Sequence, residues 1–90
     1  MEFEFDEKKS AANLEKHKID FIEAQRIWAD PNRLEIPART DGSEFRFVVI
    51  GQVSGKVWSA VITYRGSAVR IISVRHTKKN ELAAYEGEND

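Results

Sequence analysis

The stretch EFRFVVIGQVSGKVWSAVITYRGSAVRIISVRH, residues 44–76, decides the fold. It holds three runs rich in branched and aromatic side chains, a composition typical of β-strands, separated by the segments SGK and RGS. Turns this short join antiparallel neighbours, because a parallel return needs a connection of about a dozen residues or more. Upstream, Leu34 and Ile36 alternate with Glu35 and precede the segment TDGSE. The sequence therefore predicts a four-stranded antiparallel meander.

The N-terminal residues predict a short strand and a helix. Phe3 and Phe5 alternate with acidic residues, as in a half-buried strand. Residues 7–17 contain neither Gly nor Pro and predict a helix that Asp6 caps. The candidates for the inward face of this helix are its apolar residues Ala11, Ala12 and Leu14.

A second helix is expected after Asp20, because Asp20 and Glu23 have the spacing of a capping box. The segment DPN at residues 30–32 ends it, since a proline disfavours the helical conformation of the residue before it. Its inward stripe consists of residues at helical spacing, namely Phe21, Ala24, Ile27 and Trp28.

A third helix is predicted near the C-terminus, through Leu82, Ala83 and Tyr85. Residues 87–90 form an acidic tail that we expect to fray, so residues 1–86 make one domain. The fold class is therefore α+β, with two N-terminal helices and a C-terminal helix packed on the meander, plus the short N-terminal strand. The aromatic residues are interpreted as core rather than as a surface for stacking bases: Trp28, Trp58, Phe45, Phe47 and Tyr64.

Composition narrows the classes of function. The chain has no cysteine, which excludes disulfides and thiolate metal sites and favours a cytoplasmic location. No run approaches the length of about 18 apolar residues that a membrane span needs, and the start MEFEFDEKK lacks the features of a signal peptide. The formal net charge is −1, yet residues 63–81 carry five Lys or Arg against one Glu. This local excess can bind a few phosphates without coating nucleic acid nonspecifically.

The last predicted strand raises a geometric question. Strict alternation places Arg75 on one face with Val69 and Arg70 on the other face with His76, unless a bulge intervenes. For each arginine alone, a solvated or ion-paired role is the simpler interpretation.

The two histidines, His17 and His76, have no metal-ligand pattern around them, but imidazole carries protons readily near neutral pH. For His17 the simpler interpretation is a favourable contact with the helix dipole.

The chain resembles the BrnT toxins of type II toxin–antitoxin systems over nearly its whole length. The resemblance is carried by NLEKH at residues 13–17, by the Asp-Pro after the second helix, and by VRIISVRHTKKNELAAY at residues 69–85. It implies a fold similar to that of RelE-type ribonuclease toxins, cleavage of RNA, and arrest of translation. It also implies a BrnA-like antitoxin that neutralises the toxin in a hetero-oligomer and binds operator DNA. The family commonly has a small residue where this chain has His76 or Thr77.

Metal-free cleavage of RNA needs the 2′-hydroxyl deprotonated, the 5′-oxygen protonated, and the charge of the phosphorane held by fixed cations. Arginine suits the last task because its planar fork contacts two phosphate oxygens and stays charged. We therefore assign catalysis, with no metal or other cofactor, to Lys16, His17, Arg65, Arg70, Arg75 and Glu81, with His17 or Glu81 as proton carriers. Substrate contacts are assigned to Tyr64, His76, Lys78 and Tyr85. Replacing Arg70 or Arg75 by alanine is expected to abolish toxicity without unfolding the domain.

Two alternatives remain at this point. A non-catalytic binding module, for example a repressor subunit or an adaptor, fits the near-neutral charge and the absence of a clear acid–base pair. A degenerate toxin that binds its antitoxin without cleaving RNA, acting through protein contacts and operon co-repression, fits the departure near His76.

Overall fold

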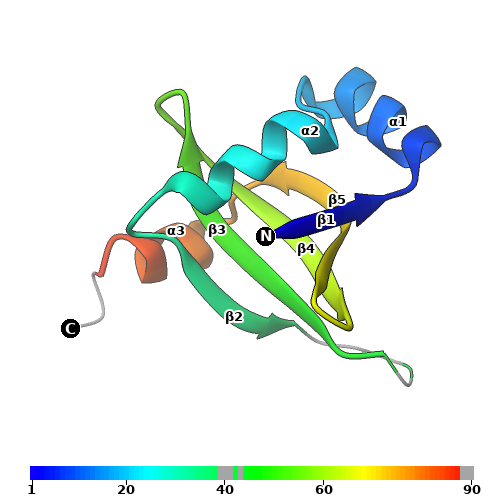
Figure 1. Cartoon of the computed structure of the whole chain (residues 1–90). Coiled ribbons are helices and arrows are strands. Elements are labelled where there is room, and N and C mark those ends of the chain that lie inside the picture. The colour runs from blue at the N-terminus through cyan, green and yellow to red at the C-terminus, as the bar shows by residue number, and fades with distance from the viewer. Residues whose placement is uncertain (39–41, 43, 88–90) are drawn as a thin grey trace.

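The computed structural model describes residues 1–38, 42 and 44–87. The elements follow one another as β1 (Glu2–Phe5), α1 (Glu7–His17), α2 (Phe21–Ala24), the 3₁₀ helix η1 (Gln25–Ala29), β2 (Leu34–Ala38), β3 (Arg46–Val53), β4 (Lys56–Arg65), β5 (Ala68–His76) and α3 (Lys79–Tyr85). Figure 1 shows α2 and η1 running across the strands, α1 beyond the end of β1, and α3, near the C-terminus, beside β3. No helix in the described part of the chain is long and apolar enough to cross a membrane.

The predicted meander is confirmed, and the sheet extends beyond it. Strands β2 to β5 pair antiparallel in sequence order. The prediction of an entirely antiparallel four-stranded sheet is wrong, because β1 adds a fifth strand parallel to β5 and gives the order β1-β5-β4-β3-β2. The physical reason is that β5 ends the meander and leaves its outer edge unpaired. The edge from Ala68 to Ile71 accepts the N-terminal strand.

The short turns have the backbone that tight hairpins need. Ser54 and Gly55 join β3 to β4, and both have positive φ angles, of 51° and 83°. Gly66, with φ of 60°, begins the turn between β4 and β5. The third expected turn, TDGSE at residues 40–44, falls largely outside the described residues.

A β-bulge in β5 determines on which face of the sheet Arg70 and Arg75 lie. Val61 pairs with Ser73 while Ile62 pairs with Ile71, so Ile72 is an extra residue without a partner on β4. The bulge reverses the alternation. Arg70 lies opposite Thr63 and Arg75 opposite Ser59, residues that share one face of β4. Both arginines therefore lie on the same face of the sheet.

The helical face of the sheet holds the main core. The predicted stripe of the second helix is confirmed, because Phe21, Ala24 and Ile27 are fully buried and Trp28 is half-buried. Gly51 of β3 permits this close approach, since a Cβ there would lie 2.8 Å from Ile27 Cγ2. The helical segment ends at residue 30, whose backbone is extended, as the following proline predicts.

Two capping predictions have different outcomes. Asp6 caps α1 and accepts hydrogen bonds from the backbone N–H groups of Lys8 and Lys9. Asp20 accepts from the backbone N–H of Glu23 at 2.7 Å, which is half of the predicted capping box. The carboxylate of Glu23 pairs instead with Arg26 at 3.1 Å.

The core assignment of the aromatic residues is wrong for two of the five. Trp58 is buried, and Trp28 and Phe47 pack against the core. Phe45 is 77% exposed and Tyr64 is 45% exposed. Phe45 precedes β3 and Tyr64 is the second-last residue of β4, so both lie at strand ends, where an alternating pattern does not ensure burial.

The apolar inward face predicted for α1 is also wrong. Ala11 and Ala12 are exposed, and Leu14 is 47% exposed. The buried residues of α1 are Ser10 and Asn13.

Hydrogen bonds explain why this face is polar. Ser10 Oγ accepts from the N–H of Phe21 at 2.9 Å, and Asn13 Nδ2 donates to the carbonyl of Ile19 at 2.8 Å. Asn13 Oδ1 also accepts from the N–H of Val74 at 3.1 Å. This N–H lies on the part of β5 beyond the end of β1. Hydrogen bonds from polar side chains thus fix α1 against the sheet edge.

Replacing Asn13 with alanine is therefore expected to lower the free energy of unfolding by about 2 kcal/mol, because two buried backbone groups lose their partners. Urea denaturation measures this loss. The matched control is Leu14→Ala on the same helix, for which we expect a change of at most about 0.5 kcal/mol. A larger loss for Leu14→Ala than for Asn13→Ala would show that apolar packing, rather than these hydrogen bonds, holds α1 on the sheet.

Candidate functional site

Arg65 and Arg70 meet at one carboxylate. Their Nη1 atoms lie 3.5 Å and 3.3 Å from the same oxygen, Oε1 of Glu4. The parallel pairing of β1 with β5 places Glu4 directly beside Arg70. All three side chains are partly exposed, so water screens these pairs and each contributes little to stability. The sequence did not reveal Glu4 as a partner, because the β1–β5 pairing was not predicted.

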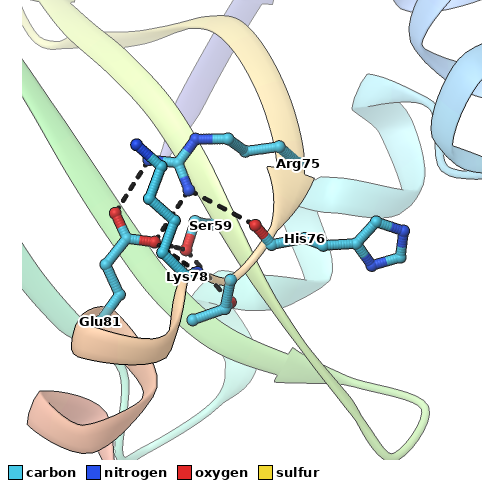
Figure 2. A network of polar contacts seen from close by, with 6 residues as sticks. Ser59, Arg75, His76, Lys78 and Glu81 are labelled. Atoms are coloured by element: carbon cyan, nitrogen blue, oxygen red, sulfur yellow. Dashed lines mark hydrogen bonds and ion pairs between the residues drawn. The ribbon is translucent and has the colours of Figure 1, made fainter.

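Arg75 is held by a buried carboxylate (Figure 2). Its Nη1 and Nη2 donate to the two oxygens of Glu81, each at 2.8 Å. Glu81 Oε1 also accepts from Ser59 Oγ at 2.9 Å and from the backbone N–H of Lys78 at 3.0 Å. The side chain of Glu81 is only 7% exposed. This is a charge-assisted bidentate pair with further hydrogen bonds, which fixes the guanidinium plane.

The charges of this pair favour a positioning role for Glu81. The hydrogen bonds from Arg75 lower the pKa of Glu81 from 4.5 to about 2, and the same contact raises the pKa of Arg75. Glu81 is therefore ionised at neutral pH and has little tendency to exchange a proton. An arginine has five N–H donors. Among the described residues, Arg75 uses two for Glu81 and one for the carbonyl of His76. The others are available to a bound anion.

A cavity of about 360 Å³ lies at the edge of β5, beyond the point where β1 ends; we call it the edge cavity. One wall is α1, through residues at i, i+3, i+4 and i+7, and the other is β5 from Ile72 to Arg75. The edge cavity brings together three predicted catalytic residues, Lys16, His17 and Arg75, and adds Lys9. Among the residues that the structure describes, its lining includes no carboxylate: Lys9, Ala12, Asn13, Lys16, His17, Phe21, Ile72, Ser73, Val74 and Arg75.

A second cavity, also of about 360 Å³, adjoins the edge cavity at His17, which lines both; we call it the histidine cavity. The rings of His17 and His76 are edge to face with their centroids 5.7 Å apart. His76 also stacks on Trp58 at 4.6 Å. His17 lies in the last turn of α1, the position on which the expected helix-dipole contact depends, and it also lines both cavities.

The remaining predicted residues lie elsewhere. The hydroxyl of Tyr64 donates to Glu35 at 2.7 Å. Burial is the larger cause and this hydrogen bond the smaller one that raise the pKa of Tyr64 to about 12. The hydroxyl of Tyr85 donates to Asp30 at 2.5 Å. This hydrogen bond is the larger cause and burial the smaller one that raise the pKa of Tyr85 to about 12. Lys78 is exposed at the start of α3, where its backbone holds Glu81. Neither tyrosine lines the edge cavity or the histidine cavity.

The structure adds residues that the sequence reasoning missed. Lys9 lies seven residues before Lys16, a spacing that places both on one side of a helix, so this pair was readable from the sequence. Ser59 lies opposite Arg75 on β4, and only the register reveals it. Within the described ranges, no group of three or more His, Cys, Asp or Glu side chains is placed to hold a metal ion.

Comparison with known families agrees with the resemblance seen in the sequence. A search of curated proteins found no match. The model of the family described as the ribonuclease toxin BrnT of type II toxin–antitoxin systems matches residues 5–81. The matched range runs from the end of β1 to Glu81 and includes every residue that lines the edge cavity. The chain therefore belongs to the BrnT family of ribonuclease toxins of type II toxin–antitoxin systems.

Proposed function

We propose that this chain is a metal-independent endoribonuclease and that the edge cavity is its active site. The observation that carries the proposal is the convergence of Lys16, His17 and Arg75 on one cavity, which no carboxylate of the described residues lines. Such a site attracts the phosphodiester of RNA and supplies both a proton carrier and fixed cations. The family described for this chain is that of a ribonuclease toxin, which supports the same chemistry.

The proposed reaction is an attack of the ribose 2′-oxygen on the adjacent phosphorus. The neutral imidazole of His17 takes the proton of the 2′-hydroxyl, and a new P–O bond forms. The P–O5′ bond breaks, and the leaving oxygen takes a proton from the Lys16 ammonium or from solvent. The products are a 2′,3′-cyclic phosphate and a 5′-hydroxyl end, so atoms and protons balance without a metal.

Arg75 holds the negative charge that develops on the phosphorane. Glu81 fixes the plane of its guanidinium before the substrate arrives, so little reorganisation is needed during the reaction. Lys9 and Lys16 add positive charge from α1. Glu81 thus acts through Arg75, as a positioning residue rather than as a proton carrier.

Arg65 and Arg70 bind the RNA backbone away from the scissile bond in this proposal. Arg70 lies on the same sheet face as Arg75, at a distance of about 15 Å along β5, which corresponds to two or three nucleotides. Glu4 orients the two arginines, and phosphates compete with it for them.

Arg70→Ala is expected to leave the domain folded, with a stability loss of at most about 1 kcal/mol, because its ion pair is partly exposed. It should weaken RNA binding and reduce the slope of log K against log salt by about 1. Binding of an uncleavable 2′-O-methyl RNA at several salt concentrations measures the slope. A slope equal to that of the wild-type protein would exclude Arg70 from the phosphate contacts.

The test of the proposed function is cleavage of end-labelled RNA by the purified protein in the presence of a metal chelator. We expect cleavage with 2′,3′-cyclic phosphate ends, which is lost in Lys16→Ala and retained in Lys8→Ala, an exposed lysine on the same helix. Cleavage that disappears with the chelator would refute metal independence. Absence of cleavage under all conditions, with RNA binding retained, would support the binding module or the degenerate toxin instead.

We further propose that cleavage occurs in the cytoplasm, arrests translation, and is neutralised by a BrnA-like antitoxin in a hetero-oligomer that binds operator DNA through the antitoxin. The type II system described for the family implies an antitoxin. The element order of one strand, two helices, an antiparallel meander and a C-terminal helix supports the RelE-like fold that the resemblance implies. Expression of the chain alone should lower protein synthesis, and coexpression of the product of the adjacent reading frame should restore it.

The non-catalytic alternative is favoured by one observation. Arg75 already has a bidentate partner in Glu81, as a purely structural arginine would. The ends of the RNA decide between the two functions, because a binding module leaves the labelled RNA intact.

A further inference from the structure

The histidine cavity has features that the proposed cleavage does not use. In the part of the chain that the structure describes, it is lined by both imidazoles, two lysines and one carboxylate, together with the indole of Trp58. The carboxylate, Glu23, already pairs with Arg26 at 3.1 Å. The remaining charged groups of the lining are the cations Lys18 and Lys56. The cavity therefore combines aromatic surface with positive charge.

The aromatic surface consists of the stacked rings of Trp58 and His76, which both line the cavity. Trp58 is buried, while His76 is exposed and stacks on the indole with an angle of 28° between the rings. Burial of Trp58 fixes the position of His76. Lys56 Nζ lies 5.7 Å from the centre of the Trp58 ring, within range of a cation–π contact that holds the lysine beside the stack.

The location links this surface to the proposed chemistry. His17 lines both cavities, so the histidine cavity begins where the edge cavity ends. A nucleotide joined to a phosphate in the edge cavity therefore has a flat aromatic surface and a cation within reach. Exposed aromatic side chains beside cations bind unstacked bases of single-stranded RNA, because every base presents a π face.

We propose that the histidine cavity is a nucleotide subsite that binds one base of single-stranded RNA, next to the scissile phosphate. The base stacks on His76, which Trp58 supports from below, and Lys56 and Lys18 bind the following phosphate. Lys18 Nζ donates one hydrogen bond to the carbonyl of Glu15 at 3.4 Å and keeps further donors for this contact. This inference rests on the proposed position of the scissile phosphate in the edge cavity.

The test compares two uncleavable RNAs on the full chain. Both are 2′-O-methyl oligonucleotides of equal length, one with all its bases and one with a series of abasic positions. The wild-type protein should bind the complete RNA about tenfold more tightly than the abasic one. His76→Ala should lose this preference, binding the complete RNA about tenfold less tightly and the abasic RNA as the wild type does. Lys56→Ala should weaken both RNAs, and the exposed control Lys8→Ala should weaken neither.

The outcomes separate this inference from the proposed function. If the wild-type protein cleaves RNA but His76→Ala keeps the full preference for bases, the subsite is refuted and the nuclease stands. If the preference depends on His76 but no cleavage occurs, base binding in the histidine cavity stands, and both the nuclease and the scissile phosphate beside this cavity are refuted. Folding of His76→Ala is checked by near-ultraviolet circular dichroism. A second variant, His76→Phe, which retains a ring on Trp58, should preserve the preference for bases.

Discussion

His17→Ala is expected to slow RNA cleavage by about 100- to 10,000-fold, the usual contribution of a general acid or base. The imidazole of His17 lies on the boundary of the two cavities and is the proposed acceptor of the 2′-hydroxyl proton. Its contact with His76 is a ring contact at 5.7 Å, so its removal leaves no buried group without a partner. Single-turnover cleavage rates measure the loss, and circular dichroism checks the fold.

Two comparisons make this result specific to the imidazole. Leu14→Ala changes the same helix on its exposed side and should cleave at the wild-type rate. His17→Gln, which removes the imidazole but keeps a polar side chain, should cleave as slowly as His17→Ala. A His17→Ala variant that cleaves within threefold of the wild-type rate would remove His17 from the mechanism.

Glu81→Gln is expected to lower the free energy of unfolding by about 3 kcal/mol at neutral pH. The reason is the hydrogen-bonded pair with Arg75, which lowers the pKa of Glu81 from 4.5 to about 2. Such a pKa difference corresponds to about 3 kcal/mol of stability. Because the folded-state pKa is the lower one, this stability is present above pH 4.5 and is lost as the pH falls towards 2.

Urea denaturation between pH 7 and pH 2 measures this dependence. The difference between the wild-type protein and Glu81→Gln should be largest near pH 7 and should shrink below about pH 5. Glu23→Gln is the matched control, because Glu23 forms an exposed pair with Arg26 and its loss should cost at most about 0.5 kcal/mol. A difference for Glu81→Gln that stays constant across this range would show that the carboxylate charge contributes nothing.

The same pair changes what the arginine variants can test. The sequence led us to expect that both Arg70→Ala and Arg75→Ala remain folded. Arg75→Ala leaves the carboxylate of Glu81 buried without its cation, which costs about 3 to 5 kcal/mol in comparable pairs. Arg70→Ala removes a partly exposed contact with Glu4 instead. Loss of activity in Arg75→Ala therefore combines a folding effect with a catalytic one, whereas Arg70→Ala, which removes only a partly exposed contact, reports on RNA binding away from the scissile bond.

Local patterns in the sequence predicted the meander and the second helix, because each depends on neighbouring residues. The turns at Ser54 and Gly66 and the buried stripe from Phe21 to Ile27 are examples. The pairing of β1 with β5 joins residues 2–5 to residues 68–71, which lie far apart in the sequence, so no local pattern encodes it. The polar face of α1 was missed for a similar reason, since Asn13 is buried only because Ile19 and Val74 supply its partners.

The candidate site was predictable in residue types and only partly in geometry. Lys16, His17 and Arg75 were named from the sequence, and the edge cavity brings them together. The side on which each arginine lies depends on one extra residue, Ile72, and strict alternation would separate Arg70 from Arg75. Tyr64 and Tyr85 were also named from the sequence, but they do not line the two cavities. The hydroxyl of Tyr85 donates to Asp30 and that of Tyr64 to Glu35 instead.

The most direct test of the edge cavity is a nuclear magnetic resonance titration of the labelled protein with an uncleavable 2′-O-methyl RNA. The ring protons of His17, the side-chain Nε–H of Arg75 and the backbone N–H of Val74 report on its walls. If RNA phosphate binds between α1 and the edge of β5, these signals shift most and saturate together. Saturable shifts confined to the exposed aromatic residues Phe45 and Tyr64, with His17 and Arg75 unchanged, would place RNA elsewhere and contradict the proposed active site.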